Sequence, residues 1–245
     1  MKIGIIVAEP EELEEISKII EITNRNKIFE LNFIEGKIKN NECILVKGGV
    51  GKVNAARATQ ILIDNYKPDY IIDTGVAGGL NPMLEIGDIV IGEKLVQHDF
   101  DITAFGHTKG YITGVGDKIY ADEFLLSKIE KVIENQEEKT YKVEKGIIAS
   151  GDIFCTDVAM RDKIYAKFDA DCVEMEGAAV AQVCYLCNIP FIVIRSISDT
   201  PNGNNTVTFD KFIEMASKRC VLILKKLIEE LKWSFLGRSK KGSLQ

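Results

Sequence analysis

Carboxylates gather around two segments that could bring them to one place. Glu176 opens an alanine-rich segment after Val173–Met175, and Asp199 closes the segment that follows the apolar run Phe191–Ile194. A continuous apolar run is typical of a strand that is buried on both faces. Ligands of open α/β sheets bind beyond the carboxyl ends of the strands. The spacing therefore places two carboxylates where acid and base catalysis is expected, and Glu12 adds a third near the amino terminus.

Each acid also has an ordinary structural explanation when it is taken alone. Glu12 and Glu176 stand at predicted helix starts, where the helix dipole stabilises negative charge. Asp199 could cap a helix or pair with Arg195. The chain has only two histidines, and neither has the partners of a catalytic triad or a metal site. Acid–base chemistry in this protein would therefore depend on carboxylates.

Two glycine-rich segments resemble nucleotide-binding loops but lack their other residues. Gly48–Lys52 has Val46 where a P-loop needs its first glycine and Val53 where it needs serine or threonine. Gly75–Gly79 is followed about twenty residues later by Leu95, not by the acid that binds a dinucleotide ribose. We interpret these glycines as points of close approach for neighbouring backbone or for a nucleoside ligand.

The elements that would position these residues alternate between strands and helices over the whole chain. Strands are predicted at Ile3–Val7, Phe29–Lys37, Cys43–Lys47, Tyr70–Thr74, Ile86–His98, Val143–Ala149, Val173–Met175 and Phe191–Ile194. Helices are predicted from Pro10, from the segment Gly48–Lys52 to about Asn65, and over Asp122–Glu134, Asp157–Phe168, Gly177–Cys187 and Thr208–Lys232. The pattern predicts a single α/β domain over residues 1–232, with 233–245 as a disordered or expression-derived tail.

Composition excludes several classes of protein. Of 245 residues, 46% are hydrophobic and 28% charged, as in globular proteins, and the net charge of −6 comes without a basic cluster for nucleic acid. No apolar run is long enough to span a membrane, so we expect a cytoplasmic protein. The six cysteines are scattered, and we interpret them as reduced thiols rather than as disulfides or a zinc site.

Nine segments carry a resemblance to a known family. They are MKIGIIVAEPEE (1–12), GGVGKVNAA (48–56), DTGVAGGL (73–80), GDIVI (87–91), HDFDITAFG (98–106), SGDIF (150–154), VEMEGAAVAQVC (173–184), RSISD (195–199) and TFDKF (208–212). In this order they resemble the 5′-methylthioadenosine/S-adenosylhomocysteine nucleosidases, of the nucleoside phosphorylase/hydrolase superfamily. The resemblance implies a three-layer α/β/α sandwich around a central mixed β-sheet, of the nucleoside phosphorylase type.

The implied activity is hydrolysis of the N-glycosidic bond of 5′-methylthioadenosine and S-adenosylhomocysteine, with 5′-deoxyadenosine as a further candidate. Adenine and the 5′-thio-substituted ribose would be released, without a metal or an organic cofactor. By resemblance, Glu12 is the general base that activates water and Asp199 the acid that protonates adenine N7. Arg195 and Ser198 help to order the water and Asp199. Glu176 binds the ribose 2′- and 3′-hydroxyls.

The resemblance also assigns residues that bind the substrate without taking part in proton transfer. Met175 packs against the ribose, Phe154 stacks on adenine, and the backbone of Cys155 binds the purine edge. Val50 and Phe209 line an apolar pocket for the 5′-substituent. The remaining substrate-binding positions are Ala8, Val76, Gly78 and Glu174.

The partners implied are a small adenine nucleoside and a second copy of the chain. In the family, the loop around Ile102 and Phe105 completes the neighbouring subunit's pocket, which implies a homodimer. Two positions depart from the family pattern: Val76 replaces the usual serine near the attacking water, and Glu9-Pro10 replaces the usual Met-Glu at the pocket edge near Ala8.

Three alternatives stay open. A nucleoside phosphorylase on the same fold is disfavoured, because Glu12 would repel phosphate but would activate water. A futalosine-type nucleoside could be the substrate, since an apolar pocket discriminates 5′-groups weakly. A non-catalytic nucleoside-binding relative is disfavoured by the joint presence of Glu12, Glu176 and Asp199.

Overall fold

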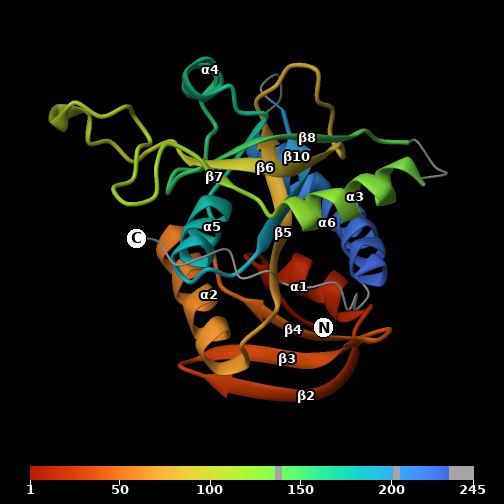
Figure 1. Ribbon diagram of the computed structural model, residues 1–245. Helices are drawn as coiled ribbons and strands as arrows, with labels where there is room; N and C mark the ends of the chain where they lie inside the picture. The colour runs from red at the N-terminus through yellow and green to blue at the C-terminus, as the bar shows by residue number, and fades with distance from the viewer. Residues whose placement is uncertain (136–139, 201–204, 232–245) are drawn as a thin grey trace.

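The computed structural model describes residues 1–135, 140–200 and 205–231, and of residues 205–210 it describes the backbone alone (Figure 1). The elements in chain order are β1 (Lys2–Val7), α1 (Pro10–Ser17), β2 (Glu21–Ile28), β3 (Leu31–Ile38), β4 (Asn41–Lys47), α2 (Lys52–Tyr66), β5 (Tyr70–Gly79), β6 (Ile89–Gln97), η1 (Thr103–Phe105), β7 (Ile119–Tyr120), α3 (Glu123–Glu134), β8 (Val143–Ser150), α4 (Val158–Phe168), β9 (Cys172–Glu174), α5 (Gly177–Leu186), β10 (Phe191–Asp199) and α6 (Asn205–Glu230).

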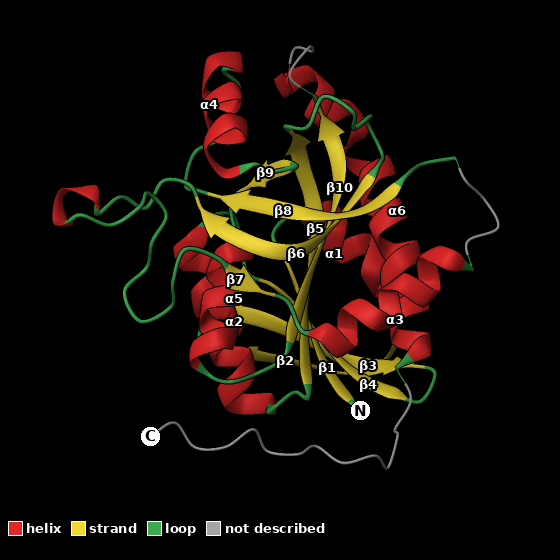
Figure 2. Cartoon of the chain, turned by 45° about the horizontal axis from the view of Figure 1, so that its top comes forward, coloured by secondary structure: helices red, strands yellow, loops and turns green. Residues whose placement is uncertain are grey.

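One mixed sheet holds these strands in the order β10-β6-β8-β9-β5-β1-β4-β3-β2, with β7 paired to β6. β10 also pairs with β5, so β5, β9, β8, β6 and β10 close on themselves (Figure 2). The pairs β1–β4, β1–β5 and β10–β5 are parallel. The predicted mixed α/β fold is confirmed.

Helices cover both faces of the sheet. α2 and α5 pack over one face around a core that includes Leu62, Val180 and Val193. α1, α3 and α6 cover the other face around Ile16, Ile129 and Leu224 (Figure 1). The strands between them are apolar on both sides, which explains the continuous hydrophobic runs in the sequence.

The parallel strands β1, β5 and β10 lie side by side and end at the same edge of the sheet. α1 follows β1 directly, and Asp199 is the last residue of β10. Chain segments far apart in sequence are therefore brought together beyond these carboxyl ends.

The sheet differs from the prediction at β2, at the end of β5, and at β10, which continues from Ile194 to Asp199. β2 was not predicted, because its residues are almost all exposed and show no alternation of apolar and polar side chains. It is held by antiparallel pairing with β3. Gly75–Gly79 was interpreted as a loop but continues β5, because its backbone pairs with β10 and β9.

The six cysteines are all unpaired; five are buried and Cys187 is partly exposed. Among the described residues, no helix combines the length and the apolarity needed to cross a membrane. The tail predicted at 233–245 lies outside the described residues.

Candidate active site

A cavity of about 320 Å³ lies beyond the carboxyl ends of β1, β5 and β10; we call it the carboxyl-end cavity. Its walls are Ala8, Glu9, Glu12, Val50, Val76, Ala77, Gly78, Ile153, Phe154, Cys155, Arg161, Val173, Glu174, Met175, Glu176, Ser198 and Asp199. It has the size of a small-ligand site, with apolar walls and a few polar groups.

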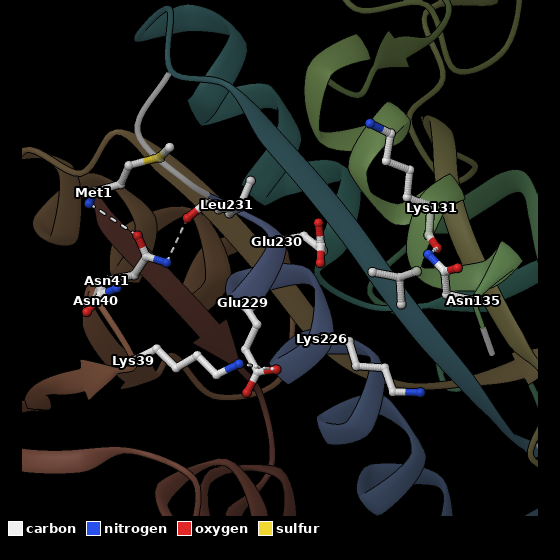
Figure 3. Close-up of a pocket in the computed structure, with 11 residues that line it drawn as sticks. Met1, Lys39, Asn40, Asn41, Lys131, Asn135, Lys226, Glu229, Glu230 and Leu231 are labelled. Carbon is white, nitrogen blue, oxygen red and sulfur yellow. Dashed lines mark hydrogen bonds and ion pairs between the residues drawn. The ribbon is translucent and has the colours of Figure 1, made fainter. Parts of the chain in front are cut away.

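A larger cavity, of about 530 Å³, lies at the opposite ends of the strands near Met1. There the Asn41 side chain accepts a hydrogen bond from the Met1 amine and donates to the carbonyl of Leu231, so it ties the amino terminus to the end of α6 (Figure 3). Lys39 and Glu229 pair with each other on its rim. These contacts join structural elements at the ends of the chain, whereas the smaller cavity gathers buried carboxylates.

Glu12 is held in place by backbone amides. It lies in the first turn of α1, is 4% exposed, and accepts hydrogen bonds from the amides of Ala8 and Glu9 at 2.9 Å and of Val76 at 3.0 Å. Burial raises its pKa to about 7, although these bonds and the charge of Arg195 act in the opposite direction. A Cβ on Gly75 would overlap with Glu12 Oε1, so only glycine leaves room for the carboxylate here.

Asp199 is 1% exposed and is bound on both oxygens. Ser198 Oγ donates to Oδ1 at 2.9 Å, and Arg161 Nη2 donates to Oδ2 in a buried ion pair. The same guanidinium donates to the carbonyl of Cys155 at 2.7 Å and to that of Gly79 at 3.2 Å. Arg161 therefore joins the end of β10 to the segment that carries Phe154 and Cys155.

Arg195 lies behind the cavity wall rather than on it. Its Nη2 donates to Glu174 Oε2 at 2.5 Å and to Asp73 Oδ2 at 2.6 Å, and all three side chains are buried. Glu174 Oε2 also accepts the amide of Gly177 at 2.7 Å. Burial raises the pKa of Asp73 to about 6, against the lowering effect of Arg195. Arg195 thus orients Glu174 and offsets part of the negative charge beside the cavity.

Glu176 projects from the turn before α5. Its Oε1 accepts the amide of Gly51 at 2.8 Å, which connects the turn to the start of α2. Burial and, next, the charge of Glu174 raise the pKa of Glu176 well above its ordinary value. Glu12, Glu174 and Glu176 thus place three carboxyl groups on the cavity wall, and the raised pKa values of Glu12 and Glu176 reduce their negative charge at neutral pH.

The structure brings most predicted site residues together. Twelve of them line the carboxyl-end cavity: Ala8, Glu12, Val50, Val76, Gly78, Phe154, Cys155, Glu174, Met175, Glu176, Ser198 and Asp199. Arg195 reaches it only through Glu174. Ile102 and Phe105 do not line it; Phe105 is 82% exposed on the loop that projects from the body (Figure 1). Phe209 lies in α6, but its side chain is outside the described part of the chain.

Two residues that form buried ion pairs at the site, Arg161 and Asp73, were not predicted. Arg161 falls inside a predicted helix, where its position carries no signal that distinguishes it from a surface arginine. Asp73 does carry a signal, because it is a carboxylate within a strand that is otherwise apolar. Such a residue needs a buried cationic partner, and Arg195 is that partner.

Comparisons with known proteins agree with this geometry. A family model described as the Phosphorylase superfamily matches residues 2–229. The 5′-methylthioadenosine/S-adenosylhomocysteine nucleosidase of Bacillus thuringiensis (strain Al Hakam) is 39% identical over 236 residues, which cover 95% of this chain and 100% of the relative.

Solved structures are similar over nearly the same length. The S-adenosylhomocysteine nucleosidase of Streptococcus pyogenes, in complex with 5-methylthiotubericidin, is 38% identical with a TM-score of 0.90, covering 95% of this chain and 98% of its own. The futalosine hydrolase of Helicobacter pylori strain 26695 is 33% identical with a TM-score of 0.90, covering 94% and 98%. Family match, identity and coverage together show that this chain belongs to the phosphorylase superfamily and, within it, to the 5′-methylthioadenosine/S-adenosylhomocysteine nucleosidase family.

Proposed function

We propose that the protein hydrolyses the N-glycosidic bond of 5′-methylthioadenosine and S-adenosylhomocysteine, and also accepts 5′-deoxyadenosine. The products are adenine and the 5′-substituted ribose. The observation that carries the proposal is the joint placement of Glu12, Glu176 and Asp199 on one cavity of about 320 Å³. The family membership of the chain supports the same reaction.

Glu12 acts as the base in this proposal. Water gives a proton to the carboxylate while its oxygen attacks the anomeric carbon of the ribose. A carboxyl with a pKa of about 7 is a stronger base than an ordinary one and is still largely ionised just above neutral pH. The three amides fix the direction of its oxygens, so little reorganisation is needed for proton transfer.

Asp199 acts as the acid and must carry a proton when it reaches adenine N7. Protonation lets adenine leave as a neutral molecule as the bond to the anomeric carbon breaks. Arg161 donates hydrogen bonds to both Asp199 and the carbonyl of Cys155, the groups assigned to the purine edge.

The ribose acquires positive charge as the bond to adenine breaks, and carboxylates stabilise that charge. Glu176 is assigned to the 2′- and 3′-hydroxyls, and Met175 to the ribose face. Phe154, half-exposed at the cavity mouth, is assigned to stacking on adenine, and Val50 to the 5′-substituent. Glu174, on the same cavity wall, is a further carboxylate that can stabilise the positive charge on the ribose.

The charge distribution favours water over phosphate as the nucleophile. Arg161 is paired with Asp199, and Arg195 with Glu174 and Asp73. Within the described part of the cavity wall, no other arginine or lysine faces the ligand space. A phosphate dianion beside Glu12 would meet like charge without a free cation.

The test is product analysis with 5′-methylthioadenosine, with and without added phosphate. The proposal expects adenine and free methylthioribose at a rate that is indifferent to phosphate. Dependence on phosphate, with a ribose 1-phosphate product, would instead place the protein with the phosphorylases.

Futalosine-type nucleosides are a second candidate substrate. The similarity to the H. pylori futalosine hydrolase favours it, and about half of the Phe154 and Val50 surfaces remains exposed at the cavity mouth, where a larger 5′-group could lie. Competition between methylthioadenosine and futalosine for one site would give the ratio of their kcat/KM values and so identify the preferred substrate.

We also propose that the protein works as a homodimer. Phe105 and the half-buried Ile102 lie on a projecting loop, and a large exposed aromatic side chain is typical of an interface. The loop would then complete the neighbouring subunit's cavity. Sedimentation analysis of the wild-type protein and of Phe105→Ser tests this, since a monomeric wild-type protein contradicts it.

A further inference from the structure

Three loops from different parts of the chain are bonded to one another beside the carboxyl-end cavity, and two of them line it. They are the turn 48–51 before α2, the segment 98–106 after β6, and the segment 151–157 before α4. The first carries Val50 and the third carries Phe154 and Cys155. The second carries Ile102 and Phe105. Pairing between β6 and β8 ends at Gln97 and Ser150, directly before the second and third loops.

Side chains of Lys52, Asp99 and Asp152 connect all three loops. Lys52 Nζ donates to Asp99 Oδ1 at 2.6 Å, and the amide of Asp152 donates to Asp99 Oδ2 at 2.9 Å. The amide of Lys52 donates to Asp152 Oδ1 at 2.8 Å. The three residues thus form a closed ring of hydrogen bonds in which Asp152 caps the start of α2.

Two further contacts support the ring. Gln97 Oε1 accepts a second bond from Lys52 Nζ at 3.1 Å, and its amide donates to Gln182 in α5 at 2.7 Å. Gly151 lies so close to the buried His98 ring that a Cβ would overlap with Nε2. The third loop therefore reaches Asp99 only because residue 151 has no side chain.

The ring is connected to two residues of the cavity wall, Glu176 and Phe154. Gly51 immediately precedes Lys52, and its amide donates to Glu176 at 2.8 Å. Asp152 is two residues before Phe154. Burial acts to raise the pKa of Asp99, but the bonds from Lys52 and Asp152 outweigh it, so its pKa lies below the ordinary value and Asp99 stays ionised at neutral pH.

We propose that Lys52, Asp99 and Asp152 are positioning residues that hold the ribose-binding and adenine-binding walls of the cavity at their working separation. They do not touch the reacting atoms. Their loss would therefore weaken nucleoside binding while leaving the chemical step, carried by Glu12 and Asp199, nearly unchanged. This inference rests on the proposed function, because it assigns Glu176 to the ribose and Phe154 to adenine.

Asp152 allows a matched pair of variants. Asp152→Asn keeps the Oδ1 acceptor for the Lys52 amide, whereas Asp152→Ala removes it; neither changes the backbone bond to Asp99. Lys52→Met tests the ring independently, because it keeps the aliphatic stem and removes both Nζ bonds. Asp152→Ala loses a helix cap with a charged acceptor, and Lys52→Met loses the charged hydrogen bond to Asp99. Either loss predicts a rise in KM for methylthioadenosine of about tenfold. We expect kcat to stay within about twofold and Asp152→Asn to resemble the wild type.

Hydrogen exchange of the intact protein gives a second readout that needs no turnover. In Asp152→Ala and Lys52→Met, the amides of 48–52, 98–106 and 151–157 should all exchange faster, while those of β1 and β10 keep their rates. Calorimetry with methylthio-immucillin-A should show the same loss of affinity as KM.

The proposal would be overturned if Asp152→Ala and Asp152→Asn had the same KM for methylthioadenosine and the same exchange rates. So would a fall in kcat with KM unchanged, or faster exchange confined to the substituted loop. If Asp152→Ala fails to fold, Lys52→Met and Asp152→Asn still decide it. Absence of methylthioadenosine cleavage by the wild-type protein would refute the proposed function alone, because the exchange result stands without turnover.

Discussion

The pH dependence of turnover gives the sharpest test of Glu12. In the free protein its pKa is about 7 because the side chain is buried, and kcat/KM reports ionisations of the free enzyme. A base works only when it is ionised, so activity should fall as the pH drops through 7. The perturbation is therefore a change of pH from 8 to 5, followed by the same series in Glu12→Gln.

The expected size of the fall follows from the pKa. With a pKa of about 7, the ionised fraction is about 0.9 at pH 8 and about 0.01 at pH 5, so kcat/KM should drop about 90-fold. A carboxyl at the ordinary value of 4.5 would lose only about a quarter of its ionised form over this range. The two cases differ by more than any plausible error of measurement.

The assay is the release of adenine from methylthioadenosine at saturating and limiting substrate. Asp73 and Glu176 also have raised pKa values, so the fall in activity at low pH has to be assigned to Glu12 by substitution. Glu12→Gln separates them, because it should lower kcat by about 10² to 10⁴ and remove the limb near pH 7. An acid limb with its midpoint near 4.5, or one that survives in Glu12→Gln, would refute the reasoning.

Three further substitutions test the site. Gly75→Ala should displace the Glu12 carboxylate and lower kcat by about 10² without unfolding the protein, as circular dichroism and steady-state kinetics would show; normal turnover would contradict the overlap. Asp199→Asn should abolish turnover and keep analogue binding in calorimetry, and near-normal turnover would remove Asp199 from the role of acid. Glu176→Ala should weaken binding of ribosides but not of free adenine, and equal losses for both would exclude a ribose contact.

Prediction of the fold from the sequence succeeded where hydrophobic patterns are strong. The apolar runs of β1 and β10 identified strands that are buried on both faces, and the acid-rich start after Pro10 identified α1. It failed where pairing rather than burial creates the strand. β2 is exposed along nearly its whole length, and Gly75–Gly79 has no side-chain pattern, so only their partner strands define them.

The sequence likewise identified some residues of the candidate site and missed others. Glu12, Glu176 and Asp199 could be selected from residue type, position at element ends and resemblance to a family, and all three line the carboxyl-end cavity. The ring formed by Lys52, Asp99 and Asp152 could not be selected, because each of its bonds joins loops separated by about fifty or a hundred residues.

By itself, then, the sequence determined which acids are available and at which strand or helix ends they stand. Only the tertiary structure decided their environment: Arg161 is paired with Asp199 across 38 residues and Arg195 with Asp73 across 122. The physical reason is that a charge interacts according to distance and burial, and both are set by how the strands are ordered in the sheet rather than by their order in the chain. The same burial turns Glu12 from an ordinary surface acid into a carboxyl with a pKa of about 7.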